Sequence, residues 1–196
     1  MTTNRRVVPK NSIRNAPKDG ADFYPTPPWA TRALLAYESF DGTILEPCCG
    51  DGAMAKVFVE AGYTVDASDL HDRGYGTQKS FFDITTPQDN IVTNPPFNIA
   101  EEILSHGLSL IRGKMALFLR TAFVESVGRY HRVYSVHPPS RIYAFAKRVS
   151  LYPAGEKTSG GTTSYSWFIW EREKPVRTEM LWIAPDAGEQ KPGLFD

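Results

Sequence analysis

The sequence predicts an α/β fold in which a mostly parallel sheet carries helices on both faces. Short apolar runs alternate with stretches of helical apolar spacing between residues 44 and 119. This pattern is typical of parallel strands joined by right-handed crossovers. The first apolar run leads through a Gly-rich turn into a helix, and a later run ends in Asn-Pro-Pro-Phe. Both sequences are typical of ligand sites at the ends of strands.

The expected elements follow one another with short connections. Thr26 is a good N-cap and Pro27 suits the first helical position, so we expect a helix from there to Tyr37. The later elements are a strand at 44–47, a helix at 53–61, strands at 64–68 and 90–93, a helix at 99–111, a strand at 115–119, a helix at 121–134, and strands at 141–145 and 164–170. Residues 1–20 are polar, basic and aperiodic, which indicates a flexible arm.

The turn at residues 46–52, EPCCGDG, joins the first strand to a helix. Such a turn lets the backbone approach a nucleoside closely. It lacks the Gly-Lys-Ser/Thr sequence of a phosphate-binding loop, and Glu46 and Asp51 would repel a phosphate. The two acids favour a cationic or zwitterionic ligand instead. S-adenosylmethionine meets this requirement, because it carries a sulfonium and an ammonium and no phosphate.

Two further acids follow in the order of a nucleoside site. Asp69 ends the second strand, where a carboxylate accepts hydrogen bonds from both ribose hydroxyls. Asp83 follows two phenylalanines, and we expect it to accept from the adenine amine of the cofactor. One such acid alone is more often a surface carboxylate. The order of the Gly turn and the two acids is what favours a cofactor site.

The strand at 90–93 ends in Asn94-Pro95-Pro96-Phe97. The two prolines fix φ at about −65° and remove two N–H donors. The side-chain oxygen of Asn94 and the carbonyl of Pro95 remain as acceptors, and the Phe97 ring is suited to lie against a flat base. These groups hold a planar amine while an electrophile attacks it. The alternative interpretation is that the two prolines only terminate the strand.

These motifs resemble the S-adenosylmethionine-dependent amino methyltransferases, specifically the small adenine-N6 DNA methyltransferases of phages and prophages. The resemblance extends over residues 22–170 and includes FYPTPP at 23–28. It implies the following site residues: Tyr24, Pro25 and Thr26 on the methionine side of the cofactor, Glu46, Cys48, Gly50 and Asp51 in the cofactor loop, Asp69 at the ribose, Asp83 at the cofactor adenine, and Asn94, Pro95, Pro96 and Phe97 in the catalytic pocket.

The resemblance also implies a Rossmann-like class I methyltransferase fold with a seven-stranded sheet. The strands at 141–145 and 164–170 would form its C-terminal antiparallel hairpin. We expect the catalytic domain at residues 21–174, between the basic arm at 1–20 and a C-terminal tail at 175–196. Longer members of the family carry a target-recognition domain, and this chain has no obvious one, so the target sequence stays open.

The charges of the chain balance overall but are unevenly distributed. Residues 20–111 carry four Lys/Arg and thirteen Asp/Glu, whereas residues 112–148 carry eight Lys/Arg and the single acid Glu125. A one-sided basic segment directly after the catalytic loop indicates contact with a polyanion rather than a solvated face. The residues expected to bind nucleic acid are Arg120, Arg129, Arg132, Arg141, Lys147 and Arg148.

The expected function is transfer of a methyl group from S-adenosylmethionine to the N6 amine of adenine in DNA. Acceptors at Asn94 and Pro95 would localise the nitrogen lone pair for direct in-line transfer to a flipped base. Cys48 is expected to pack in the turn rather than act as a nucleophile. The alternatives are an RNA adenine-N6 methyltransferase, a protein glutamine methyltransferase, which needs no basic face, and a non-catalytic nucleic-acid-binding module.

We expect a cytoplasmic protein of a bacterium or a phage-infected host, and we favour a monomer while the oligomeric state stays open. No apolar run approaches the length of a membrane span, and the N-terminus lacks the apolar segment of a secretory signal. Two adjacent cysteines form no ordinary disulfide framework, and four scattered histidines lack metal-ligand spacing. The C-terminal sequence QKPGLFD looks like the short peptides that dock on bacterial sliding clamps, with an ordinary frayed tail as the alternative.

Overall fold

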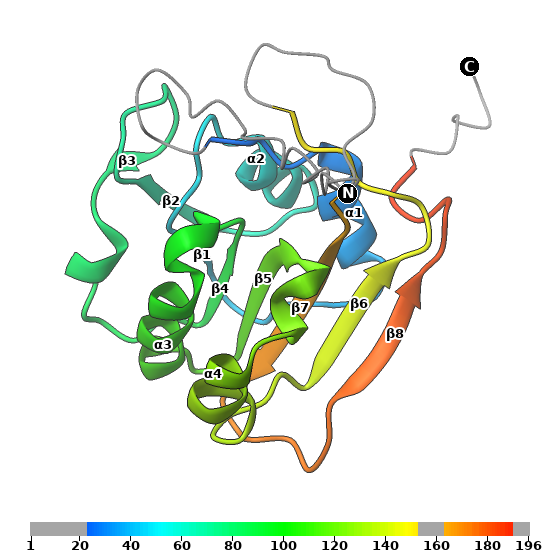
Figure 1. Cartoon of the computed structure of the whole chain (residues 1–196). Helices are drawn as coiled ribbons and strands as arrows, with labels where there is room; N and C mark the ends of the chain where they lie inside the picture. Colours follow the sequence, from blue (N-terminus) through cyan, green and yellow to red (C-terminus); the bar gives the residue numbers. More distant parts are fainter. Residues whose placement is uncertain (1–22, 153–162, 190–196) are drawn as a thin grey trace, which may run out of the picture.

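The computed structural model describes residues 23–152 and 163–189. An eight-stranded sheet in the order β3-β2-β1-β4-β5-β7-β6-β8 forms its centre (Figure 1). The strands are β1 (Ile44–Glu46), β2 (Val65–Asp69), β3 (Thr77–Gln78), β4 (Asn90–Thr93), β5 (Lys114–Arg120), β6 (Arg141–Phe145), β7 (Tyr165–Glu171) and β8 (Glu179–Ile183). The basic arm at 1–20 and the clamp-like sequence at 190–196 lie outside the described residues.

Four α-helices, three 3-10 helices and one π-helical stretch accompany the strands in the described part of the chain. They are α1 (Pro28–Leu35), α2 (Ala53–Glu60), α3 (Ala100–Leu110) and α4 (Val127–Arg129), the 3-10 helices η1 (Phe81–Asp83), η2 (Phe97–Ile99) and η3 (Thr121–Val124), and the π-helical stretch η4 (Tyr130–Tyr134). Among the described helices, none has the length and apolar character needed to cross a bilayer.

The sheet confirms the predicted α/β fold. Strands β2, β1, β4 and β5 run parallel, and β7 is antiparallel to both β5 and β6. β6 and β7 are therefore the predicted C-terminal hairpin. The strand order reverses at β1, because β2 and β4 lie on either side of it. Open α/β sheets bind their ligands at such a reversal, beyond the carboxyl ends of the strands.

The expected number of seven strands is wrong, because β8 adds an eighth. It pairs in parallel with β6 along its whole length, from Arg141 opposite Glu179 to Phe145 opposite Ile183. β8 falls within the segment 175–196 that was expected to be a tail. The continuous apolar run at 180–183 is the sequence signal for this strand. As an edge strand it leaves Trp182 exposed, so it lacks the alternation of a half-buried strand.

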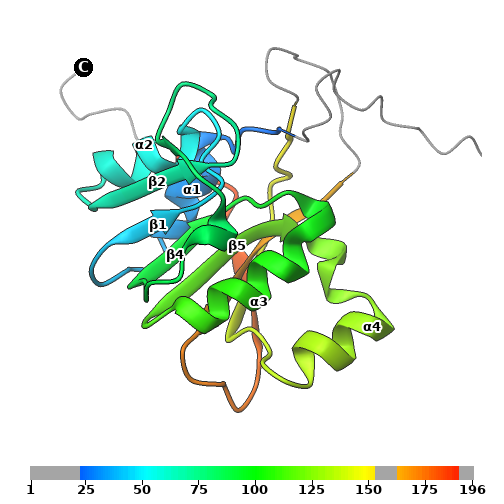
Figure 2. The same cartoon turned by 90° about the vertical axis from the view of Figure 1, so that its left-hand side faces the viewer.

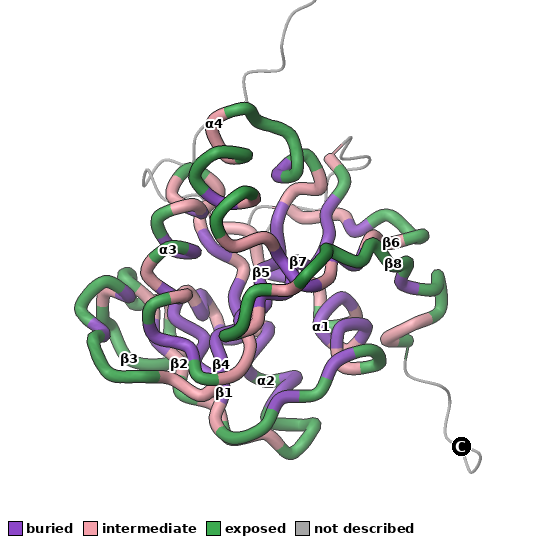
Figure 3. Tube along the Cα trace, turned by 90° about the horizontal axis from the view of Figure 1, so that it is seen from below, coloured by how far each residue is buried: buried purple, intermediate pink, exposed green. Residues whose placement is uncertain are grey.

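Alternation along the central strands divides the core into two layers. In β5, Met115 and Leu117 pack in the layer that contains α3, whereas Ala116 and Phe118 pack in the layer that contains α1 and α2. Figure 2 shows α3 lying across one face of the sheet, and Figure 3 shows buried residues concentrated in β4, β5 and β7 between α3 and α1. Full burial of a side chain such as Met115, Leu117 or Phe118 stabilises the fold by about 1.5–3 kcal/mol. The well-packed central strands hold their carboxyl ends in fixed positions.

Two helices differ from the expectation. α1 starts at Pro28 after Pro27, and the Thr26 side chain makes no capping hydrogen bond, so the predicted N-cap is wrong. The predicted continuous helix at 121–134 is broken into η3, α4 and η4. The break falls at Glu125, whose backbone is extended, and Ser126 then starts a new helix by accepting the Arg129 N–H. A serine N-cap inside an apparent helical pattern explains this interruption.

Candidate functional site

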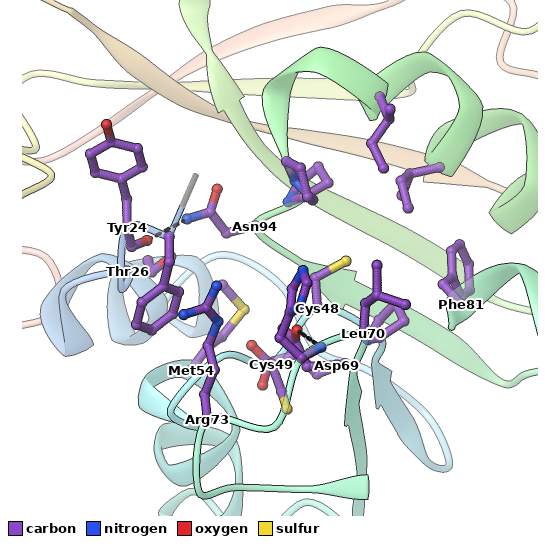
Figure 4. Close-up of a pocket in the computed structure, with 18 of the residues that line it drawn as sticks. Tyr24, Thr26, Cys48, Cys49, Met54, Asp69, Leu70, Arg73, Phe81 and Asn94 are labelled. Atoms are coloured by element: carbon purple, nitrogen blue, oxygen red, sulfur yellow. Dashed lines mark hydrogen bonds between the residues drawn. The ribbon is translucent and has the colours of Figure 1, made fainter. Parts of the chain in front are cut away.

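A cavity of about 260 Å³ opens at the carboxyl ends of β1, β2 and β4, where the strand order reverses (Figure 4). It is built from segments far apart in the sequence. The predicted site residues that line it are Tyr24, Pro25, Thr26, Glu46, Cys48, Asp51, Asp69, Asn94, Pro95, Pro96 and Phe97. The fold thus brings the expected cofactor residues and the expected catalytic residues to one cavity.

The Gly turn is held in place by Asp69 and Phe23. One carboxylate oxygen of Asp69 accepts the Gly50 N–H at 2.9 Å, and the other accepts the His71 N–H at 2.9 Å. Gly50 has a φ of 55°, and a Cβ built there would lie 2.2 Å from Cε2 of Phe23. Both the backbone conformation and the neighbouring ring therefore require glycine. Gly50 supports the cavity through this turn and is not itself a lining residue.

Replacing Gly50 by alanine is expected to lower the free energy of unfolding by about 1–3 kcal/mol, from backbone strain and displacement of Phe23. Urea unfolding measures the loss. Gly62→Ala is the matched control, because Gly62 also has a positive φ, 89°, but a Cβ at Gly62 would have nothing within 4 Å. A loss no larger for Gly50→Ala than for Gly62→Ala would show that Phe23 does not restrain the turn.

Glu46, at the end of β1, is a buried acid without a full set of partners. Its side chain is 2% exposed, and Oε2 has no hydrogen-bond partner among the described residues. Burial raises the pKa of Glu46 well above its ordinary value, and the nearby Asp51 and Asp69 carboxylates raise it further. A hydrogen bond from the Ala55 backbone acts in the opposite direction. A cationic ligand group would satisfy this oxygen and favour its charged form.

Asn94 has a defined orientation at the end of β4. Its side-chain NH2 donates to the carbonyl of Tyr24 at 3.0 Å, as Figure 4 shows. A backbone carbonyl can only accept, so this bond fixes which end of the amide is nitrogen. Oδ1 is then left as an acceptor beside Pro95 and Pro96, which have no N–H. The acceptor role of Asn94 and Pro95 toward a ligand stays a prediction.

Phe97 lines the cavity next to these acceptors and contacts two other side chains. The Arg120 guanidinium lies 4.8 Å from the centroid of the Phe97 ring, and the Tyr165 ring lies 5.8 Å away at a tilt of 33°. Arg120 ends β5, so it reaches Phe97 across the carboxyl edge of the sheet. These contacts hold the Phe97 ring in one orientation.

Of the predicted cofactor residues Asp83 and Cys48, only Cys48 lies at the cavity. Asp83 is exposed and does not line the cavity; Ser80, Phe81 and Phe82 of the same segment do. The structure therefore does not bring Asp83 to the site. Cys48 lines the cavity, but desolvation and the Asp69 carboxylate raise the pKa of its thiol to about 12. A protonated thiol of this kind is unsuited to act as a nucleophile.

The predicted nucleic-acid-binding residues separate into groups. Arg120, Lys147 and Arg148 follow or end β5 and β6 at the carboxyl edge, where the cavity opens. Lys147 forms an ion pair of 2.6 Å with Glu189 there. Arg129 and Arg132 instead share Glu101 of α3, at 3.0 and 2.7 Å.

Arg141 lies at the opposite edge of the sheet. It begins β6, which runs in the same direction as β5, so it sits beside Lys114 at the amino ends of these strands. Its guanidinium binds the buried Glu38, and it also pairs with Glu171 at 2.7 Å. Lys114 and Tyr143 bind the same Glu38 carboxylate. The structure therefore places Arg141 in an internal ion-pair network, away from the cavity.

Several lining residues were not predicted from the sequence. Phe23 covers the Gly turn, Leu70 follows Asp69, and Arg73 lies with its guanidinium 4.3 Å from the centroid of the Phe23 ring. Leu70 and Arg73 belong to the loop after β2. The sequence signal that could have predicted Leu70 and Arg73 as lining residues is their place in a loop directly after the acid at the end of a strand, where α/β folds place ligand contacts.

Comparisons with known proteins address the fold. No protein-family model and no curated protein matches the sequence. A proposed RNA methyltransferase of Pyrococcus horikoshii aligns with a TM-score of 0.57 and 13% identity, over 81% of this chain and 90% of that chain. A type I restriction-modification methyltransferase subunit of Streptococcus thermophilus has a TM-score of 0.57 and 12% identity, over 88% of this chain and 50% of that one.

Magnesium protoporphyrin IX methyltransferase of Synechocystis PCC 6803, solved with bound S-adenosylmethionine, gives a TM-score of 0.52 and 14% identity, over 74% of this chain and 76% of that one. The substrates of these three proteins differ, and what they share with this chain is the sheet and its covering helices. The chain has the Rossmann-like fold of class I methyltransferases.

Proposed function

We propose that this protein transfers a methyl group from S-adenosylmethionine to the N6 amine of adenine in DNA. The observation that carries the proposal is the fixed orientation of Asn94, whose NH2 is bound to Tyr24 and whose Oδ1 is left beside Pro95. This acceptor pair lines the same cavity as the Gly turn. An amine acceptor site joined to a nucleoside-binding turn favours methylation of an amino group.

The residues of the cavity fit the proposed cofactor. The unpartnered Oε2 of Glu46 suits the ammonium of its amino-acid portion. Asp69 ends β2 with a carboxylate that suits the ribose hydroxyls. Leu70 and Phe81 lie on the side of the cavity away from Tyr24 and Thr26, as Figure 4 shows, and they offer apolar surface for a purine ring. When bound, S-adenosylmethionine supplies a methyl group made electrophilic by its sulfonium.

The residues of the chain would act on the amine by position and electrostatics. The N6 lone pair of adenine is delocalised into the ring. Asn94 Oδ1 and the Pro95 carbonyl would accept the two amine hydrogens and so localise the lone pair on nitrogen. Phe97, held by Arg120 and Tyr165, would stack on the base and orient it, contributing about 1–3 kcal/mol. No covalent intermediate with the protein is needed.

The choice of DNA rests on the basic residues at the open edge and on one structural neighbour. Arg120 contacts the cavity residue Phe97, and Lys147 and Arg148 follow β6 at the same edge of the sheet. At this edge the three residues would meet phosphates next to a flipped nucleotide. One structural neighbour is the methyltransferase subunit of a type I restriction-modification system, and it shares the fold. RNA adenine is the second candidate, since an RNA methyltransferase also shares the fold, with a TM-score of 0.53 for the 23S rRNA methyltransferase ErmE.

The test is transfer of labelled methyl from S-adenosylmethionine to duplex DNA, with RNA and protein assayed in parallel. Digestion to nucleosides and mass spectrometry then locate the mark. N6-methyladenine in DNA is the expected result. Label in RNA alone would reassign the substrate, label in protein would favour a glutamine amide, and cofactor binding without any transfer would favour a non-catalytic module.

Glu46 gives cofactor binding a defined pH dependence. Its pKa is raised in the free protein, so the carboxyl stays protonated to a higher pH than an ordinary glutamate, and an ammonium ligand favours the charged form. Binding is therefore expected to release a proton below the free-state pKa, and affinity should rise with pH until the pH passes that value. Calorimetry in buffers of different ionisation enthalpy measures the release.

Glu46→Gln should abolish this proton release, whereas Glu60→Gln, at an exposed position on α2, should retain it. The same raised pKa means that Glu46 lowers the stability of the free protein as pH rises above the ordinary pKa of a glutamate. Equal proton release from the wild type and Glu46→Gln would remove Glu46 from the ammonium site.

A further inference from the structure

Arg73 is the one Lys or Arg among the described residues that line the cavity. It lies in the loop after β2, beyond Asp69. Its guanidinium rests over the Phe23 ring, 4.3 Å from the centroid. The acids of the lining are Glu46, Asp51 and Asp69. The cavity is therefore acidic with a single strong cation, and that cation is held in place by an aromatic ring.

The donors of Arg73 are not engaged by the rest of the described chain. Within residues 23–152 and 163–189, no hydrogen bond or ion pair joins its guanidinium to another side chain or to the backbone. Arg129 and Arg141, by contrast, are fixed by carboxylates. A guanidinium carries five N–H donors in a planar fork that matches a carboxylate in two parallel bonds. The ring contact orients this fork and leaves its N–H groups available.

The position of Arg73 indicates which part of a ligand it would meet. Figure 4 shows Arg73 on the same side of the cavity as Tyr24, Thr26 and Met54, with Leu70 and Phe81 on the other side and Asp69 between them. If the purine lay on the apolar side and the ribose at Asp69, the amino-acid portion of the cofactor would lie on the side of Arg73. That portion is zwitterionic, and its carboxylate needs a cation among these acids.

We propose that Arg73 binds the carboxylate of the amino-acid portion of S-adenosylmethionine, opposite the acid that binds its ammonium. The inference rests on the proposed function, because it names a contact within the same cofactor site. It divides recognition of the amino acid between two groups of opposite charge, Glu46 at the end of β1 and Arg73 in the loop after β2. Ligands without the carboxylate should then bind without using Arg73.

Calorimetric titration with two ligands tests this division. The probes are S-adenosylmethionine and decarboxylated S-adenosylmethionine, which keeps the ammonium, sulfonium and nucleoside. Arg73→Met is expected to lose about 10- to 100-fold in affinity for the first ligand and to bind the second as the wild type does. The affinity of Arg73→Lys for S-adenosylmethionine should lie between those of the wild type and Arg73→Met, since lysine keeps the charge but lacks the planar fork.

Arg112→Met is the control, because Arg112 is exposed at the opposite edge of the sheet beside Asp89. It should bind both ligands as the wild type does. Equal weakening of both ligands in Arg73→Met would mean that Arg73 only braces Phe23, and it would overturn the proposal, as would no weakening of either. A wild-type chain that binds neither ligand would overturn the proposed function and this inference with it.

Discussion

Replacing Asn94 by alanine is expected to lower the rate of methyl transfer by at least about 10²–10³-fold, while cofactor affinity stays within about threefold of the wild type. Alanine removes the side-chain acceptor for the amine, and the remaining acceptor, the Pro95 carbonyl, holds one hydrogen only. Single-turnover transfer to DNA measures the rate, and calorimetry measures the affinity.

Asn98→Ala is the control for this experiment. Asn98 also lines the cavity but makes no hydrogen bond to Tyr24, whereas Asn94 donates to that carbonyl at 3.0 Å. The control should keep most of its activity. A large loss of cofactor affinity in Asn94→Ala would instead assign Asn94 to the cofactor site, by way of the segment that begins at Phe23.

Asp69→Ala is expected to weaken cofactor binding by about 100-fold or more, because two hydrogen bonds from ribose to a charged acceptor are lost together. The Gly50 N–H also loses its acceptor, which loosens the turn. Calorimetric titration with S-adenosylmethionine provides the measurement, and transfer at saturating cofactor should recover much of the wild-type rate.

Asp66→Ala offers a matched control on the same strand, since Asp66 is exposed and does not line the cavity. It should bind the cofactor as the wild type does. The cofactor affinity of Asp69→Asn should lie between those of Asp69→Ala and Asp66→Ala, because the amide keeps one acceptor oxygen without the charge. Unchanged affinity in Asp69→Ala would move the ribose contact to another residue.

Features that depend on local covalent geometry could be predicted from the sequence. The Gly turn and Asn94-Pro95-Pro96-Phe97 are of this kind, since glycine permits the positive φ of Gly50 and proline removes a donor wherever it stands. The central strands could be predicted as well, because short apolar runs that alternate with stretches of helical spacing are typical of buried parallel strands. The cavity that joins these segments follows from the parallel sheet, which brings strand ends to one edge.

Features that depend on partners far away in the sequence could not be predicted. The basic segment is continuous along the chain, but Arg141 is neutralised by Glu38 and Glu171, and Arg129 by Glu101. No local sequence pattern predicts these ion pairs. Arg73 shows the converse, because an isolated arginine in a polar loop has no periodicity, and only the fold places it in the cavity. The roles assigned to these residues stay predictions.

The bond from Asn94 to Tyr24 turns the amide nitrogen away from the acceptor site, and neither following proline has an N–H. A deaminated adenine, which bears a carbonyl in place of the amine, would set oxygen against oxygen there. Sites built to bind an N–H group reject analogues that lack it by about 10⁴–10⁵-fold. If the protein methylates adenine as proposed, hypoxanthine and guanine would be rejected because a carbonyl oxygen replaces the amine, and a deaminated adenine in the strand would stay unmethylated.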